Sequence, residues 1–220
     1  MTFSILARDP SSSAIGGAAT TGSLCVGGWV LRGDACVGMS ASQGAAPSTM
    51  WGESVQIGMG KGLSAAEAVE RTTKADAGRE YRQLSALGLT GAGTVFTGNA
   101  NLPEMGGRVF EGGVVAGNLL DNTRVLDSVV AGFQSSTGAF AARLLSSLFA
   151  GRDAGGDSRG LLSAALLVVS PDHAPLTLRI DYSENPLEAL EALYKRATNG
   201  DYSVWSQQVP TLNDPERILD

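Results

Sequence analysis

Histidine and cysteine are scarce in this chain of 220 residues, which has one His and two Cys. A standard structural zinc site takes four Cys or His ligands, so such a site would need carboxylates for most of them. A Ser-His-Asp triad would have to use His173, which lies in the turn-forming segment 170–175. Cys25 and Cys36 each lie in an apolar, strand-like run, where we expect reduced thiols in the core. We expect neither a metal ion nor a cofactor.

Basic residues and long apolar runs are also few. The chain has 16 Lys and Arg against 22 Asp and Glu, and its net charge of -6 would repel a phosphate backbone. Nucleic acid is therefore not an expected partner. The first residues lack the features of a signal peptide, and no uninterrupted apolar run reaches the roughly 18 residues that span a bilayer. We expect a cytoplasmic protein without membrane attachment.

Charged residues make up only 17% of the chain, whereas hydrophobic residues make up 43%. This composition suggests that much of the surface is covered, which favours an oligomer and most simply a homodimer. The length fits a single domain with a full core.

Glycine is plentiful, with 29 residues, but the glycines do not form a phosphate loop. In the segment 58–62, Val55 stands where a P-loop needs Gly, and Lys61 is followed by Gly62 instead of Ser or Thr. No G-x-G-x-x-G opens a helix after a strand, and no G-x-S-x-G elbow is present. The glycines are expected in turns and in close sheet packing.

Thr2 carries the clearest chemical signal, because a small hydroxyl residue follows Met1 and opens an alternating strand. Removal of Met1, which the small Thr2 side chain permits, would leave one residue with a hydroxyl nucleophile and its own α-amine. That amine titrates near pH ~8 and can act as a general base. In peptide linkage to Met1 the same nitrogen could not. The alternative is an ordinary strand threonine, favoured by β-propensity.

Turn residues and hydrophobic periodicity predict the order of the elements. Two hairpins are expected first. The first has strands at 2–8 and 14–21 and would place Thr2 opposite Thr20 or Thr21. The second has strands at 24–31 and 35–42, with a turn at 32–34, and would bring Gln43 to a sheet end. Further strands are expected at 81–87, 94–97, 108–116 (one strand or a pair), 161–169 and 176–181. Helices are expected at 48–62, 64–74 with a capping box, 122–135 capped by Asn122, 137–149 capped by Thr137, and 185–198 opened by Asn185, Pro186 and Glu188.

Blocks of strands separated by helix pairs, with central strands apolar on both faces, indicate two packed sheets covered by helices. The predicted fold is α+β, a four-layer αββα sandwich. One domain is expected over residues 1–198, followed by a C-terminal tail or arm at 199–220. The tail would pack on its own domain or on a partner subunit.

Several segments resemble domain-of-unknown-function family 1028, over nearly the whole chain to about Leu193. They are 1–10 (MTFSILARDP), 78–84 (GREYRQL), 96–98 (FTG), 117–118 (GN), 155–160 (GGDSRG) and 163–165 (SAA). That family is grouped with the N-terminal-nucleophile (Ntn) hydrolases, so the resemblance implies an Ntn-hydrolase-like sandwich and amide hydrolysis, with no known substrate.

The chain departs from the family's pattern at three places. The family often has a Cys and an aromatic residue in the loop at 99–105, a His at the position of Gly107, and a Gln at the position of Ala116. If those positions shape a substrate pocket, this chain has an altered specificity or has lost activity.

Three further residues are candidates for catalysis or its support. Asn118 follows a strand and precedes a helix, where it could stabilise an oxyanion or simply form a turn. By analogy with Ntn hydrolases, Asp157 and Ser163 are candidates to support the terminal amine. Asp157 and Arg159 could instead form a structural ion pair in a Gly-rich loop.

Substrate-binding candidates are also expected near the predicted nucleophile. Thr21 and Ser23 could orient the amine or bind substrate, although hydroxyls are ordinary at strand ends. Gln43 and Arg159 are further substrate-binding candidates. Arg79 and Arg82 could hold a carboxylate, or be solvated or paired.

The leading hypothesis is a cofactor-free hydrolase of a small amide, peptide or acyl-amino compound, with Thr2 as nucleophile after Met1 removal. The alternatives are a non-catalytic member of the fold that binds a small ligand or a protein, and a subunit of a larger enzyme.

Overall fold

A computed structural model describes residues 2–219, which form ten strands, seven α-helices and one 3-10 turn. The strands are β1 (Thr2–Arg8), β2 (Ile15–Thr21), β3 (Leu31–Asp34), β4 (Gly38–Gly44), β5 (Arg82–Gly88), β6 (Thr94–Thr97), β7 (Gly106–Phe110), β8 (Gly113–Gly117), β9 (Ser163–Val169) and β10 (Leu176–Ile180). The helices are α1 (Val26–Trp29), α2 (Thr49–Gly60), α3 (Ala65–Lys74), α4 (Arg124–Ser135), α5 (Phe140–Asp153), α6 (Pro186–Ala197) and α7 (Gly200–Ser206), with the 3-10 turn at Arg79–Tyr81.

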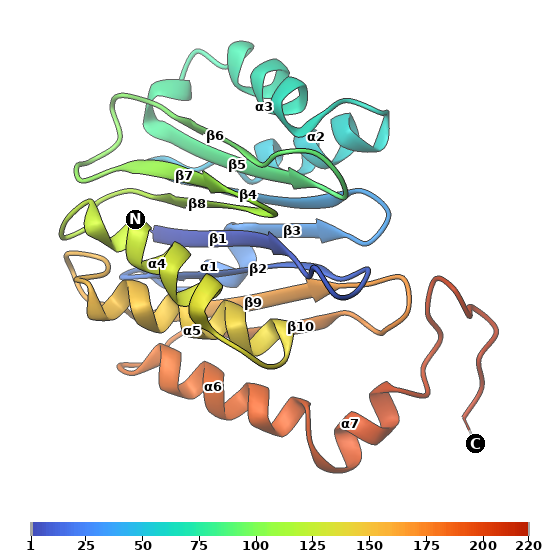
Figure 1. Ribbon diagram of the computed structural model, residues 1–220. Coiled ribbons are helices and arrows are strands. Elements are labelled where there is room, and N and C mark those ends of the chain that lie inside the picture. The colour runs from blue at the N-terminus through green and yellow to red at the C-terminus, as the bar shows by residue number, and fades with distance from the viewer. Residues whose placement is uncertain (1, 220) are drawn as a thin grey trace.

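The strands form two stacked antiparallel sheets, as Figure 1 shows. One sheet has six strands in the order β10-β9-β2-β1-β8-β7, and the other has four in the order β3-β4-β5-β6. Helices α2 and α3 pack on the outer face of the four-stranded sheet, whereas α4, α5 and α6 pack on the outer face of the six-stranded sheet. The predicted α+β class and αββα layering are therefore confirmed.

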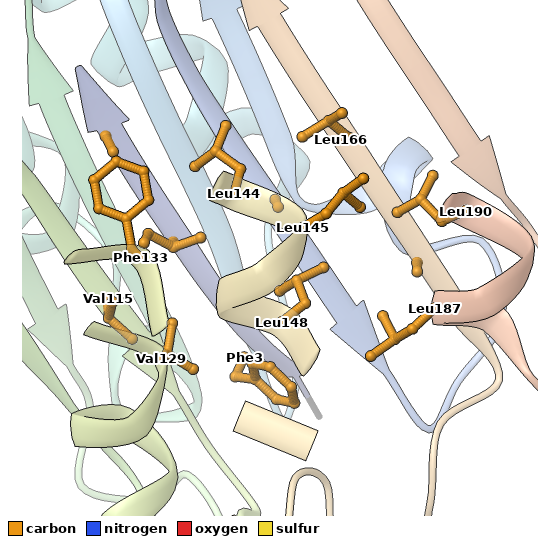
Figure 2. Close-up of a cluster of buried hydrophobic side chains, with 14 of the residues drawn as sticks. Phe3, Val115, Val129, Phe133, Leu144, Leu145, Leu148, Leu166, Leu187 and Leu190 are labelled. Atoms are coloured by element: carbon orange, nitrogen blue, oxygen red, sulfur yellow. The ribbon is translucent and has the colours of Figure 1, made fainter. Parts of the chain in front are cut away.

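Strand β1 shows how the sequence pattern builds these layers. Its side chains alternate between the two faces of the sheet. Phe3 and Ile5 enter the cluster formed with α4, α5 and α6, whereas Leu6 enters the cluster between the sheets. Figure 2 shows Phe3 beside Val129 and Leu148. Each fully buried side chain of this size contributes about 1.5 to 3 kcal/mol to stability. The alternation therefore fixes which face of β1 packs on the helices and which face packs on the other sheet.

The first hairpin forms as predicted, and Thr2 lies directly opposite Thr21. Thr21 in turn lies opposite Ser163 on β9, so these three residues form a row across neighbouring strands. Side chains in such a row share a face of the sheet. Leu6 of β1 and Ala165 of β9 pack between the sheets. Each lies an even number of residues from the row residue on its own strand, so it shares a face with that residue. The row therefore faces the space between the sheets.

The predicted strand at 24–31 is wrong, because residues 26–29 form helix α1 instead. Helix α1 crosses β9 so closely that a Cβ on Gly27 would lie 2.9 Å from the Ala165 Cβ. Only glycine permits this approach. The Ser163 hydroxyl accepts a hydrogen bond from Val26 N at 3.1 Å, which satisfies an N-terminal donor of the helix from a distant strand.

The positions expected for the two cysteines are also wrong. Residues 32–34 belong to β3, so the turn to β4 falls at 35–37 and leaves Cys36 exposed there. Its N–H donates to Asp34 Oδ1 at 2.7 Å. Cys25 is half-buried at the start of α1, with a left-handed φ of 62°. Neither thiol is a core side chain, because both residues lie where the chain turns.

The predicted helix caps are only partly present. The Ser64–Glu67 capping box is present, with both reciprocal hydrogen bonds. Thr123, not Asn122, is the N-cap of α4, although Asn122 Oδ1 accepts from Arg124 N at 3.0 Å. The N-cap residues of α5 and α6, which are Ala139 and Asn185, make no side-chain cap hydrogen bond. Packing therefore decides these helix starts more than local capping does.

The predicted tail includes helix α7 and a segment held to the body of the fold. Asn213 N donates to Pro171 O at 3.0 Å, and Asn213 Nδ2 donates to Asp172 Oδ1 at 2.6 Å. Residue 220, like Met1, lies outside the described residues. Across residues 2–219, every helix is too short or too polar to cross a membrane.

Candidate active site

A pocket of about 450 Å³ opens at the end of the sheets where β1 begins and where β2 and β4 end. Its buried floor is polar, and its wall and rim are mainly apolar. The lining residues are Thr2, Thr21, Ser23, Leu24, Val26, Trp29, Val30, Gln43, Gly44, Ala45, Pro47, Leu102 and Arg159. The structure thus brings five of the predicted site residues to one pocket.

Thr2 lies on the pocket floor with 6% of its surface exposed. Its backbone is held on both sides by Asn118, since Thr2 N donates to Asn118 O at 3.3 Å and Thr2 O accepts from Asn118 N at 3.1 Å. Thr2 O also accepts from Gln43 Nε2 at 3.1 Å. The predicted release of the Thr2 amine depends on Met1, which lies outside the described residues. Within those residues, the Thr2 backbone has a fixed position at the pocket.

Gln43 joins Thr2 to a buried network of amide side chains. Ser4 Oγ donates to Gln43 Oε1 at 2.7 Å, and Gln43 Nε2 donates to Gln83 Oε1 at 2.7 Å. Gln83 Nε2 then lies within donating distance of Thr97 Oγ1 at 2.8 Å and of the carbonyls of Gly106 and Gly117, both at 3.0 Å. The network connects the two sheets beneath the pocket.

Sequence reasoning missed Ser4 and Gln83 as part of this network. Both are completely buried, with exposures of 0%. The available signal was a polar side chain at an inward position of a largely apolar strand, because a buried amide or hydroxyl must find hydrogen-bond partners. For Gln83, that signal identifies a buried polar position but not the partners it finds.

Asn118 takes part in the same network. Its Nδ2 donates to Gln83 Oε1 at 3.0 Å, and its backbone N–H donates to Thr2 O. Its Oδ1 is buried and has no hydrogen-bond partner in the part of the chain that the structure describes. The backbone donor expected for an oxyanion is thus already engaged by Thr2. Asn118 therefore contacts Thr2 through its backbone carbonyl and N–H, and it is not among the residues that line the pocket.

Asp157 and Arg159 form a two-point ion pair at the pocket. Arg159 Nε donates to Asp157 Oδ1 at 3.1 Å, and Arg159 Nη2 donates to Asp157 Oδ2 at 2.9 Å. The Asp157 side chain has no exposed surface, whereas 37% of the Arg159 side chain is exposed. The hydrogen bonds to Asp157 raise the pKa of Arg159, against the opposing effect of burial. Arg159 lines the pocket, and Asp157 holds it from behind.

Asp157 also accepts a hydrogen bond from Gly22 N at 2.8 Å, so it ties the end of β2 to the Gly-rich loop. Both oxygens of the carboxylate are used by Gly22 and Arg159. This geometry agrees with the structural ion pair that the sequence left open. It fixes the position of Arg159 at the pocket.

Ser163 lies beside the pocket but is not among its lining residues. Its hydroxyl donates to Ser23 O at 2.8 Å and accepts from Val26 N. Thr21 Oγ1 accepts from Ser23 N at 3.3 Å. Ser163 and Thr21 therefore shape the loop that carries Ser23 and the start of α1.

The structure does not bring Arg79 or Arg82 to this pocket. Arg79 pairs with Glu80 at 3.2 Å on the surface. Arg82 pairs with Asp76 at 3.3 Å, and its guanidinium lies 5.7 Å from the centre of the Trp51 ring. Both arginines are therefore paired, which is the expected alternative to holding a substrate carboxylate. Their role as substrate-binding residues has no support from this geometry.

Comparison with known proteins gives the family. A model described as a family of unknown function, DUF1028, matches residues 2–190. The chain belongs to the DUF1028 family. A crystal structure of a DUF1028 protein from Silicibacter pomeroyi has 55% sequence identity and a TM-score of 0.96, covering 100% of this chain and 96% of that chain. A crystal structure of HslV from Trypanosoma brucei has 12% identity and a TM-score of 0.46, covering 77% of this chain and 99% of that chain. No curated protein matches.

The three departures from the DUF1028 pattern can be placed on the fold. Of the loop at 99–105, Leu102 lines the pocket. Gly107 lies on β7, where a Cβ would lie 2.6 Å from Val95 Cγ1. Ala116 is buried on β8, directly opposite Ser4. Among the described residues, the loop is the one of the three places that contributes a side chain to the pocket lining.

Proposed function

We propose that this pocket is the active site of a cofactor-free hydrolase acting on a small amide, with Thr2 as the nucleophile after removal of Met1. The observation that carries the proposal is the position of Thr2. A hydroxyl residue next to Met1 lies buried on a pocket floor, on the inner face of a central strand. A surface threonine at the same sequence position would have no cavity in which to meet a substrate.

The proposed chemistry needs only Thr2 and water. Thr2 Oγ1 attacks the amide carbonyl carbon, and the freed α-amine takes the hydroxyl proton. As the C–N bond breaks, that proton passes to the leaving nitrogen and the acyl group remains as an ester on Thr2. Water then hydrolyses the ester, which releases a carboxylic acid and restores the hydroxyl.

The contacts of Thr2 support this proposal. The hydrogen bond from Thr2 N to Asn118 O, at 3.3 Å, holds the nitrogen that would become the amine. The hydrogen bond from Gln43 to Thr2 O holds the other side of the residue. We propose that Asn118 and Gln43 are positioning residues, because both act through the Thr2 backbone. Such preorganisation avoids an entropic cost during the reaction.

The test is turnover of a panel of amides by wild type and by Thr2→Ala and Thr2→Ser, with intact-mass measurement of each protein. Wild type is expected to lack Met1 and to hydrolyse at least one amide. Thr2→Ser is expected to keep part of the activity, and Thr2→Ala to lose it. Thr90→Ala, at an exposed turn, is the matched control. Equal turnover by Thr2→Ala and wild type would rule out the nucleophile, as would full activity in protein that retains Met1.

One observation favours a second function, the binding of a small ligand without turnover. Asn118 N and Gln43 Nε2 both donate to the Thr2 carbonyl, a group that is the same whether or not the amine is free. A binding protein would show ligand-induced stabilisation without hydrolysis, and Thr2→Ala would keep it. The homodimer expected from composition stays a prediction, for which sedimentation equilibrium is the direct measurement.

A further inference from the structure

We propose that the ligand of this pocket is an N-acyl amino acid, with a carboxylate bound by Arg159 and an apolar acyl group against the pocket wall. This inference rests on the proposed function, since it names the substrate class for the same site. Three features of the lining carry it: one charge, an apolar wall, and the presence of that charge and Thr2 in one pocket.

Arg159 is the sole charged side chain among the described residues that line the pocket. The carboxylate of Asp157 lies behind it, with no exposed surface. Among the described lining residues, a ligand therefore meets a guanidinium and no acidic side chain. Arginine binds carboxylates through paired N–H donors, which makes an anionic ligand group the natural partner.

The orientation of Arg159 is set before any ligand arrives. Asp157 engages the edge formed by Nε and Nη2, so the guanidinium plane is held at two points. Arg159 Nη1 lies 3.3 Å from Ser23 Oγ, which also lines the pocket. Ser23 and the Nη1 side of Arg159 thus form one polar corner. Because Asp157 holds the side chain in place, little side-chain entropy is lost on binding.

The rest of the wall is apolar. Val26 and Val30 are buried, with exposures of 1% and 3%, and lie behind the pocket. Leu24 and Trp29 stand at its rim with 54% and 50% of their surfaces exposed. Large apolar side chains exposed around a pocket favour an apolar ligand group that covers them. An aliphatic or aromatic acyl chain fits this wall.

The polar corner lies near the end of β2, the strand that pairs with the predicted nucleophile's strand β1. Thr21 is directly opposite Thr2, and Ser23 follows Thr21 by two residues. Two residues of chain span at most about 7 Å. In an N-acyl amino acid, one amino-acid unit separates the scissile carbonyl from the carboxylate. Because Thr2, Ser23 and Arg159 line one pocket, we infer that a substrate of this class presents its carbonyl to Thr2 and its carboxylate to Arg159 together.

The reaction transfers the acyl group from nitrogen to Thr2 and then to water. The acyl carbon forms an ester with Thr2 Oγ1 as its bond to nitrogen breaks, and the free amino acid leaves with the added proton. Water then cleaves the ester and yields the apolar carboxylic acid. No oxidant, reductant or further reactant is needed.

The test measures binding apart from turnover, using calorimetry on Thr2→Ala protein. The probes are N-phenylacetylglycine and N-phenylacetylglycinamide, which differ in having a carboxylate or a neutral carboxamide. The carboxylate is expected to bind at least about tenfold more tightly, because hydrogen bonds to charged groups are the stronger ones. N-acetylglycine is expected to bind more weakly than N-phenylacetylglycine, since it leaves the apolar wall uncovered.

The variant Arg159→Gln, added to Thr2→Ala, is expected to abolish the preference for the carboxylate. Its control is Arg108→Gln, because Arg108 forms the same two-point pair with Asp127, with 40% of its side chain exposed and no place in this pocket. Arg159→Lys, which keeps the charge, is expected to keep part of the preference and guards against a folding defect in Arg159→Gln.

Equal binding of the two probes, or a carboxylate preference that survives in Arg159→Gln, would overturn the inference. So would the absence of binding by every acylglycine at millimolar concentration. The two proposals fail separately. Carboxylate-dependent binding without turnover by wild type contradicts only the hydrolase, whereas turnover of neutral amides and acylglycines at equal rates contradicts only the substrate class.

Discussion

Gln43 and Gln83 face each other across β4 and β5, and the Gln43 Nε2 donates to the Gln83 Oε1 at 2.7 Å. Both side chains are buried, with exposures of 1% and 0%. Gln43 also holds the Thr2 carbonyl of the opposite sheet, and Gln83 accepts from Asn118 of that sheet. This amide pair therefore connects the two sheets directly beneath the candidate nucleophile.

The Gln83→Leu substitution is expected to lower the free energy of unfolding by about 2 to 3 kcal/mol. Leucine has a similar volume but would leave Asn118 Nδ2 without its acceptor, and Thr97 and two backbone carbonyls without their donor. Unsatisfied buried polar groups cost about 1 to 3 kcal/mol. Chemical denaturation of both proteins measures the difference.

The control for this prediction is Gln134→Leu, at an exposed position of α4, where the expected change is within about 0.5 kcal/mol. A Gln83→Leu protein as stable as Gln134→Leu would show that the amide network contributes nothing to stability.

Two glycines in helices are expected to respond to alanine in opposite directions. A Cβ on Gly151 in α5 would lie 2.6 Å from Val129 Cγ2 and 2.7 Å from Phe3 Cε2. Overpacking of this kind costs about 1 to 3 kcal/mol. A Cβ on Gly60, at the end of α2, has its nearest contact at 3.5 Å, with Val37 Cγ2. Alanine there is expected to stabilise by about 0.5 kcal/mol, because it restricts the unfolded chain.

Thermal unfolding of Gly151→Ala and Gly60→Ala side by side measures both effects. Figure 2 shows Phe3 of β1 and Val129 of α4 together in this cluster, beside Leu148 of α5. Equal shifts of the two variants in the same direction would refute the assignment of Gly151 to a close-packed contact.

The pH dependence of stability is expected to include a contribution from Asp172. The hydrogen bonds from Ser13 and then Asn213 lower the pKa of this carboxyl below its ordinary value of 3.8. A lowered folded-state pKa means that the contribution is present above the unfolded value and is lost as the pH falls through the lower folded value. Wild type is therefore expected to exceed Asp172→Asn in stability at pH 7.

The same difference should shrink as the pH is lowered past 3.8 toward 3. Urea denaturation of both proteins at several pH values measures it. Hydrogen exchange at Asn213 gives a local readout, since the Asp172 carboxylate holds that residue to the β9–β10 turn. A stability difference that stays constant from pH 7 to 3 would contradict the assignment.

Local patterns predicted much of the fold correctly. The alternation of residues 2–8 and the turn after Asp9 predicted the β1–β2 hairpin and placed Thr2 opposite Thr20 or Thr21, because a short hairpin limits its own register. The structure has the second of these pairs. The Ser64–Glu67 capping box was predicted because all its atoms lie within one helical turn. Where partners are near in sequence, the sequence pattern is sufficient.

Predictions failed where the partner is distant. Residues 26–29 form a helix partly because Ser163, 137 positions from Val26, accepts its N-terminal hydrogen bond and Gly27 lies against β9. Cys36 is exposed because the β3–β4 turn falls at 35–37 instead of 32–34. Neither outcome could be predicted from a local window, since each depends on which strands pack together.

The sequence by itself determined the layered α+β architecture, through strand alternation and helix periodicity, and it placed Thr2 at the start of the first strand. Only the tertiary structure decided which polar side chains surround Thr2. It brought Gln43 and Arg159 to the pocket, joined Gln83 to Asn118, and left Arg79 on the surface. The physical reason is that a buried amide or charged group bonds to whichever polar group lies within hydrogen-bond distance, and groups on different strands and sheets come within that distance only when the chain has folded.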